Sequence, residues 1–73
     1  MSIVFSEHAR FQIRKRGISK ELVLRAIVNA QEIKSSYRGR KLRRLEVGDK
    51  ILEVVTRTED MRMIVITAYY LEE

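Results

Sequence analysis

The residues with the clearest potential for chemistry are one histidine and a group of basic side chains. His8 is the only histidine of the 73 residues, and histidine is the side chain that ordinarily changes charge near neutral pH. Its imidazole can act as a general base, while arginine binds a phosphate group through two parallel hydrogen bonds. Six cations fall within residues 34–44 with no acid among them: Lys34, Arg38, Arg40, Lys41, Arg43 and Arg44. These residue types favour phosphate binding, with proton transfer as an accompanying reaction.

The overall charge points to a polyanionic partner. The chain has 15 Lys+Arg and 10 Asp+Glu, a formal net charge of +5, and arginine outnumbers lysine ten to five. Tyr37 lies inside the basic group, where it could stack on a base or, as tyrosines often do in small domains, complete the core. We expect an RNA-binding surface made of Tyr37 and the basic residues Arg38, Arg40, Lys41, Arg43 and Arg44. The alternatives are a solvated basic face and a face that docks an acidic protein.

Length and composition exclude several classes of protein. Residues 1–73 fit a single domain, and a domain this short has too little chain to enclose a large cofactor pocket. With no cysteine and one histidine, we expect no disulfide, no metal site and no cofactor. The longest apolar stretch, Met63–Leu71, is far shorter than the ~20 residues of a membrane span, so we expect a cytoplasmic protein. A second copy of the chain, forming a homodimer, would supplement the small core.

Two helices are expected in the first half of the chain. Ser6 is a favoured N-cap residue type, and the first helix is expected over residues 7–16. Gly17 can adopt the left-handed conformation that commonly ends a helix. Ser19 is placed to cap a second helix, which is expected over residues 20–30.

The rest of the chain has the composition of β-strands. Strands are expected over residues 2–5, 32–37, 41–47, 50–58 and 62–71. The segment 62–71 is apolar on both faces, which predicts a central position, whereas 41–47 alternates poorly, which predicts a bulged or edge strand. We expect an α+β domain in which two N-terminal helices pack on one face of a three- to four-stranded antiparallel sheet.

Positions along the first helix suggest roles for its polar side chains. At ~100° per residue, His8 lies at the rim of the apolar stripe formed by Ala9 and Ile13, and Arg16 projects along that stripe. His8 is either a general base or a boundary histidine that bonds the backbone. Arg16 either binds phosphate, interacts with the negative end of the helix dipole, or pairs with an acid of the sheet. Arg57 is expected to reach a face of the sheet shared with polar residues of the last strand.

Several segments resemble a family of small prokaryotic domains of uncharacterised function. They are Phe5-Ser6-Glu7-His8-Ala9, Arg16-Gly17-Ile18-Ser19, Val23 with Ala26-Ile27, Gly39-Arg40-Lys41, residues 51–57, and Ile66-Thr67-Ala68-Tyr69. In that family a histidine opens a helix and Arg-Gly-Ile-Ser begins eight residues later, as it does here. The family is grouped with RelE-like toxins, and the resemblance implies their fold of two helices packed on an antiparallel sheet.

The resemblance implies a toxin-like, metal-independent endoribonuclease or a degenerate relative. His8 and Arg16 match the two best-marked polar positions of the family, and Arg40, Lys41 and Arg57 match more loosely. The implied reaction is attack of the RNA 2′-OH on the adjacent phosphorus. His8 would act as the base or acid, and Arg16 and Arg57 would hold the phosphate.

Two other functions fit the same residues. Gln12 stands where many relatives have an arginine, which removes one cation from this part of the helix. A non-catalytic nucleic-acid-binding module would keep the basic group without a convergent site. A protein-interaction module would pair the basic face with an acidic antitoxin-like protein, with Leu24 and Val28 forming part of the contact. Cleavage of RNA that depends on His8 would distinguish the enzyme from both alternatives.

Overall fold

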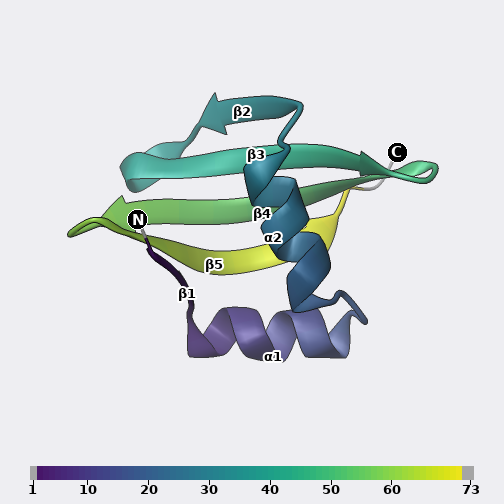
Figure 1. Ribbon diagram of the computed structural model, residues 1–73, viewed down its shortest axis with the longest axis horizontal. Helices are drawn as coiled ribbons and strands as arrows, with labels where there is room; N and C mark the ends of the chain where they lie inside the picture. Colours follow the sequence, from purple (N-terminus) through teal and green to yellow (C-terminus); the bar gives the residue numbers. More distant parts are fainter. Residues whose placement is uncertain (1, 72–73) are drawn as a thin grey trace.

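One five-stranded sheet organises the chain. The computed structural model describes residues 2–71. The elements are, in order, β1 (Ser2–Phe5), α1 (Glu7–Lys15), α2 (Lys20–Val28), β2 (Glu32–Ser35), the 3₁₀ turn η1 (Tyr37–Gly39), β3 (Arg40–Val47), β4 (Lys50–Glu59) and β5 (Arg62–Tyr70). The strand order is β1-β5-β4-β3-β2, so β1 and β2 are the two edges of the sheet (Figure 1).

The predicted three- to four-stranded antiparallel sheet is wrong, because the sheet has five strands and is mixed. Strands β2 to β5 pair antiparallel as a meander, but β1 pairs with β5 in parallel. The two helices also do not form a shared layer on the sheet. Instead, α1 runs along β5 at the sheet edge, while α2 crosses β3 and β4 on one face (Figure 1). Because β1 is only four residues long, α1 takes over the edge of β5 where β1 ends.

Two strand predictions have opposite outcomes. The central position predicted for 62–71 is confirmed, since β5 lies between β1 and β4. The edge position predicted for 41–47 is wrong, since β3 lies between β4 and β2, and the one register shift among described strands falls at Val55/Thr56. The strand expected over 32–37 ends at Ser35, because Arg38 adopts φ 60° and turns the chain through η1.

Local signals define both helices. The side chain of Ser6 accepts a hydrogen bond from the amide of Ala9 at 3.0 Å, and that of Ser19 accepts one from Leu22 at 3.0 Å. Both predicted N-caps are therefore confirmed. Gly17 has φ 69°, the left-handed conformation expected after α1.

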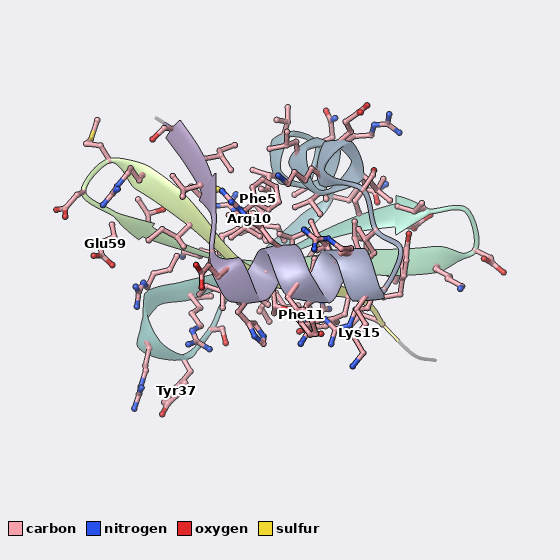
Figure 2. The ribbon with its side chains drawn as sticks, turned by 90° about the horizontal axis from the view of Figure 1, so that it is seen from below. Phe5, Arg10, Phe11, Lys15, Tyr37 and Glu59 are labelled. Carbon is pink, nitrogen blue, oxygen red and sulfur yellow. The ribbon has the colours of Figure 1, made fainter. Side chains whose placement is uncertain are left out.

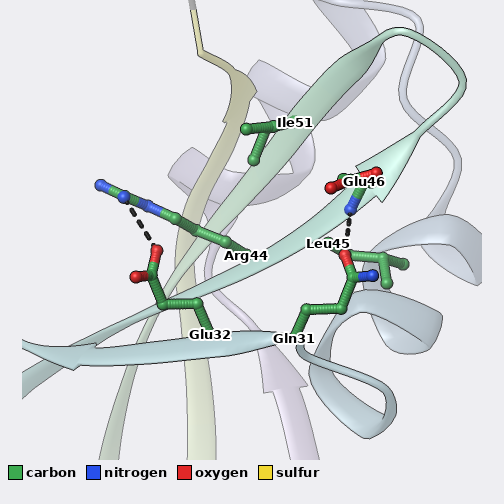
Figure 3. Close-up of a pocket in the computed structure, with 6 residues that line it drawn as sticks. All are labelled: Gln31, Glu32, Arg44, Leu45, Glu46 and Ile51. Atoms are coloured by element: carbon green, nitrogen blue, oxygen red, sulfur yellow. Dashed lines mark hydrogen bonds and ion pairs between the residues drawn. The ribbon is translucent and has the colours of Figure 1, made fainter.

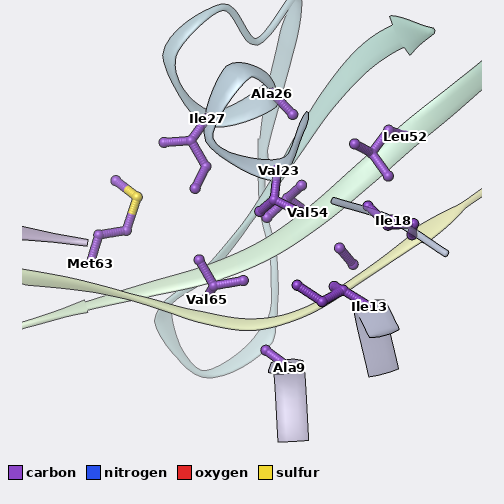
Figure 4. Packing of buried hydrophobic residues seen from close by; sticks show 11 residues of the cluster. Ala9, Ile13, Ile18, Val23, Ala26, Ile27, Leu52, Val54, Met63 and Val65 are labelled. Atoms are coloured by element: carbon purple, nitrogen blue, oxygen red, sulfur yellow. The ribbon is translucent and has the colours of Figure 1, made fainter. Parts of the chain in front are cut away.

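The hydrophobic core lies between the helices and one face of the sheet. Its buried members come from α1, from the loop that follows it, from α2, and from β4 and β5: Ala9, Ile13, Ile18, Val23, Ala26, Ile27, Leu52, Val54, Met63, Val65 and Ala68 (Figure 4). Side chains alternate along a strand, so the residues between these core positions point to the opposite side of the sheet. That opposite side carries no helix among the described residues, and we call it the open face.

Candidate nucleic-acid interface

A chain of polar residues crosses the open face from β2 to β5. The strand register places Glu32, Arg44, Glu53 and Tyr69 directly opposite one another on β2, β3, β4 and β5. We call these four residues the polar row. The Arg44 Nε donates to Glu53 Oε1 at 2.7 Å, and its Nη1 donates to Glu32 Oε1 at 3.1 Å. The Tyr69 hydroxyl donates to the other oxygen of Glu53.

Glu53 is the centre of this row. It is 3% exposed although it lies on the open face, so its carboxylate must be satisfied by protein donors. Burial and the hydrogen bond to Glu53 together raise the pKa of Tyr69 to about 12. The hydrogen bond to Glu53 also raises the pKa of Arg44 above its ordinary value. Arg44 therefore pairs with both carboxylates of the polar row and is engaged in holding strands together.

Two other arginines lie next to each other on the open face. Arg40 on β3 and Arg57 on β4 are direct cross-strand partners. One amino group of Arg57 donates to Glu59 at 2.8 Å, and the Arg57 side chain is 44% exposed. The Nε of Arg40 is buried and has no hydrogen-bond partner among residues 2–71. Two arginines thus lie side by side on the open face with one carboxylate, Glu59, paired to Arg57, and this pair of cations would stabilise an anion.

Two exposed aromatic–cation pairs lie on the same side of the molecule, one on α1 and one in η1. Phe11 on α1 is 58% exposed, and the Nζ of Lys15 lies 6.0 Å from its ring centroid. Tyr37 in η1 is 68% exposed, and the guanidinium of Arg38 lies 5.0 Å from its ring. Figure 2 shows Phe11, Lys15 and Tyr37 projecting away from α2, on the side of the open face. The interpretation of Tyr37 as a core residue is wrong, because η1 carries it beyond the sheet.

Phe11 belongs to a continuous stripe on α1. His8, Phe11 and Lys15 have the spacing i, i+3 and i+7, which places them on one side of a helix. All three are exposed, whereas the core side of α1 presents Ala9 and Ile13. We call His8, Phe11 and Lys15 the α1 stripe. It combines a titratable imidazole, an aromatic ring and a cation on one surface.

The structure divides the predicted basic surface between the two sides of the sheet. Arg40 and Arg44 lie on the open face, but Lys41 and Arg43 alternate with them and point to the side of α2. There Lys41 donates to Ser35 Oγ at 2.8 Å. Arg43 Nε donates to Thr56 Oγ1 at 2.9 Å. Their proximity in sequence predicted that Lys41 and Arg43 share one surface with Arg40. The alternation of β3 shows that this prediction is wrong.

The residues predicted to be catalytic lie on three different elements. Arg16 follows α1 and reaches β5, where its Nη1 donates to Thr67 Oγ1 at 3.3 Å and to the Ala68 carbonyl at 3.0 Å. It thereby occupies a carbonyl at the edge of β5 that β1 is too short to cover. His8 is exposed in the first turn of α1, and Arg57 is paired with Glu59 on β4. Among residues 2–71, no hydrogen bond or ion pair joins any two of these three predicted residues.

A shallow pocket lies at the far end of the polar row. It has a volume of about 130 Å³ and is lined by Gln31, Glu32, Arg44, Leu45, Glu46 and Ile51 (Figure 3). The amide of Glu46 donates to Gln31 Oε1 at 2.7 Å across it. Glu32 and Arg44 of its lining are already paired with each other, so the pocket offers little to a charged ligand.

Sequence reasoning did not identify Phe11 or Glu53. The spacing of Phe11 from His8 and Lys15 is a helical signal that is visible in the sequence. No comparable signal marks Glu53, because its burial depends on partners from two other strands.

Comparison with known proteins places the chain in one family. A family model described as a domain of unknown function (DUF4258) matches residues 5–70. The chain belongs to this family. The match runs from the last residue of β1 to the last residue of β5, so it includes the α1 stripe, the polar row and the Arg40–Arg57 pair. Neither a curated protein nor a solved structure gives a significant match. Between residues 2 and 71, no helix has both the length and the apolar character needed to cross a membrane.

Proposed function

We propose that this protein binds single-stranded RNA on its open face. The observation that carries the proposal is the arrangement of two exposed aromatic–cation pairs on the side of the molecule that also presents Arg40 and Arg57. Unpaired bases stack on aromatic rings, while arginine and lysine hold the phosphates between them. We assign stacking to Phe11 and Tyr37.

The proposal gives the basic residues unequal roles. Arg40 and Arg57 contact phosphate because they are neighbouring cations on the open face. Lys15 and Arg38 contact phosphate beside the two rings. Arg44 stabilises the sheet through Glu53 and Glu32 and contributes little to binding. The partner is RNA of the cytoplasm, the compartment predicted from the sequence.

RNA cleavage is the second candidate function, and the α1 stripe favours it. A base stacked on Phe11 brings its ribose close to the imidazole of His8, one helical turn away. His8 takes the proton of the 2′-OH, whose oxygen bonds to the phosphorus. The bond to the 5′-oxygen breaks, and that oxygen takes a proton from water, leaving a 2′,3′-cyclic phosphate. Lys15 stabilises the charge on the phosphorane.

The binding proposal is tested by fluorescence anisotropy with a labelled single-stranded RNA. Phe11→Ala and Tyr37→Ala are each expected to weaken binding about tenfold, since stacking of one base is worth about 1–3 kcal/mol. Arg40→Ala weakens binding and lowers the slope of log K against log salt by about 0.7, the value for one phosphate contact on a single strand. Lys41→Ala is the matched control, because Lys41 is the next residue of β3 and points to the other side.

The outcomes distinguish the candidate functions. Equal weakening by Arg40→Ala and Lys41→Ala would place binding elsewhere than the open face. No binding of the labelled RNA up to about 100 μM protein at low salt, where even non-specific binding is detectable, would reject the proposal. Cleavage is measured on a sequencing gel, where His8→Ala is expected to retain binding and lose cleavage. RNA methylated on every 2′-oxygen is expected to bind without being cut.

A further inference from the structure

The outer edge of β2 is an unpaired strand edge. Among residues 2–71, no strand pairs with it, and all four residues of β2 are exposed. Ile33 is 53% exposed, and Val28, the last residue of α2 before β2, is 75% exposed. Exposed strand edges recruit other strands because their backbone groups lack partners. This surface is separate from the Arg40–Arg57 pair, so the inference below goes beyond RNA binding and does not depend on it.

The hydrogen-bond pattern shows which residues of β2 face outward. The amide of Ser36 donates to the Arg40 carbonyl at 2.8 Å, just beyond the pairing of Ser35 with Lys41. Backbone groups of successive residues in an antiparallel pair point alternately toward the partner strand and away from it. Glu32 and Lys34 therefore bond to β3, while the N–H and C=O groups of Ile33 point to the outer edge.

The side chains of β2 are complementary to a second, antiparallel copy of themselves. When the twofold axis passes through Ile33, Glu32 lies opposite Lys34 of the second copy, and Lys34 lies opposite its Glu32. The two Ile33 side chains then meet across the axis. An axis through Glu32 or through Lys34 would instead place two like charges opposite each other, which is destabilising. Only the register centred on Ile33 pairs opposite charges, and it is also a register in which the free backbone groups of Ile33 find partners.

We propose that two copies of this chain dimerise through β2, antiparallel and centred on Ile33. The two five-stranded sheets then form one continuous ten-stranded sheet. A twofold axis between antiparallel strands of one sheet is perpendicular to that sheet, so the two open faces lie on the same side. The dimer covers the exposed Ile33 and supplements a core that is small for an isolated domain.

Sedimentation velocity across a protein concentration series measures the dimer directly. Lys34→Glu changes two favourable cross-strand pairs into two unfavourable ones, and we expect it to raise the dimer Kd about 30-fold. Arg25→Glu makes the same charge change on an exposed position of α2 and is expected to leave the Kd unchanged. Circular dichroism establishes that both variants are folded.

Cysteine cross-linking tests the register. The chain has no cysteine, so a single substitution reports one contact. In Ile33→Cys the two Cα atoms lie about 5.5 Å apart across the axis, within the range of a disulfide, so oxidation is expected to give a covalent dimer. In Ser35→Cys the two Cα atoms lie about 14 Å apart, so this matched variant is expected to remain monomeric on the denaturing gel.

Three results would overturn the proposal. The first is a chain that stays monomeric throughout the concentration series. The second is a dimer whose Kd is the same for Lys34→Glu as for the wild type, which would mean that another surface forms it. The third is equal cross-linking of Ile33→Cys and Ser35→Cys. Because these experiments contain no RNA, failure of the dimer leaves the RNA proposal unchanged, and failure of RNA binding leaves the dimer unchanged.

Discussion

The polar row makes Glu53 the residue on the open face whose replacement should most affect stability. Its carboxylate accepts from the Nε of Arg44 at 2.7 Å and from the hydroxyl of Tyr69. The Glu53 side chain is 5% exposed, so water cannot replace either donor. In Glu53→Gln the side chain keeps its shape, but the amide has one oxygen, and its NH₂ group then faces one of the two donors.

The expected cost follows from these contacts. A hydrogen bond to a charged group contributes about 1.5–3 kcal/mol, and the substitution removes one such bond and weakens the other. Arg44 keeps its bond to Glu32, and its side chain is 26% exposed, which limits the loss. We therefore expect Glu53→Gln to lower the free energy of unfolding by about 2 kcal/mol. For a domain of this size, that corresponds to a fall in Tm of roughly 10 °C.

Glu59→Gln is the matched control for this prediction. Glu59 lies on the same strand and the same face and also pairs with an arginine, Arg57, at 2.8 Å. The side chains of that pair are 44% and 49% exposed, so its loss should cost less than about 0.5 kcal/mol. Urea unfolding followed by circular dichroism, at one fixed protein concentration, measures both variants. Equal shifts of the unfolding midpoint would refute the reasoning, because burial of Glu53 would then have no energetic consequence.

Other predictions concern Tyr69, Gly17 and Ser6. The pKa of Tyr69 is raised from 10.0 to about 12 by burial and by Glu53, so folding favours its neutral hydroxyl. This contribution to stability is fully present below pH 10 and is lost as the pH rises to about 12. The wild type should therefore be more stable than Tyr69→Phe below pH 10 and lose that advantage by pH 12. Urea unfolding at each pH measures the difference. Gly17→Ala should lower the free energy of unfolding by about 1 kcal/mol, because φ 69° is unfavourable for alanine. Steric overlap is not the cause, since no atom lies within 4 Å of the added Cβ. Urea unfolding measures this variant too, and an unchanged midpoint would contradict the prediction. Ser6→Ala should lower the free energy of unfolding by about 1 kcal/mol through loss of the hydrogen bond from the Ala9 amide. Ser6→Asp should keep most of the wild-type stability, because aspartate is also a favoured N-cap residue.

Local features of the chain were readily predicted from its sequence. The caps at Ser6 and Ser19 and the turn at Gly17 depend on residues within one helical turn, so their outcome did not depend on the rest of the fold. The strands after α2 were also located, to within a few residues, by their composition and by the turns between them. The pairing of β1 with β5 could not be predicted from composition and turns. These two segments are separated by most of the chain, and their contact depends on where the helices lie.

The same distinction applies to the candidate site. The sequence by itself determined the chemical types available: one imidazole, a surplus of arginine and few aromatic rings. Only the tertiary structure decided which of them share a surface. The alternation of β3 separated Arg40 from Lys41, the turn at Arg38 exposed Tyr37, and the partners of Glu53 came from two other strands. Residue type is a property of each position alone, whereas the facing, burial and charge pairing of a side chain depend on contacts between segments far apart in the chain.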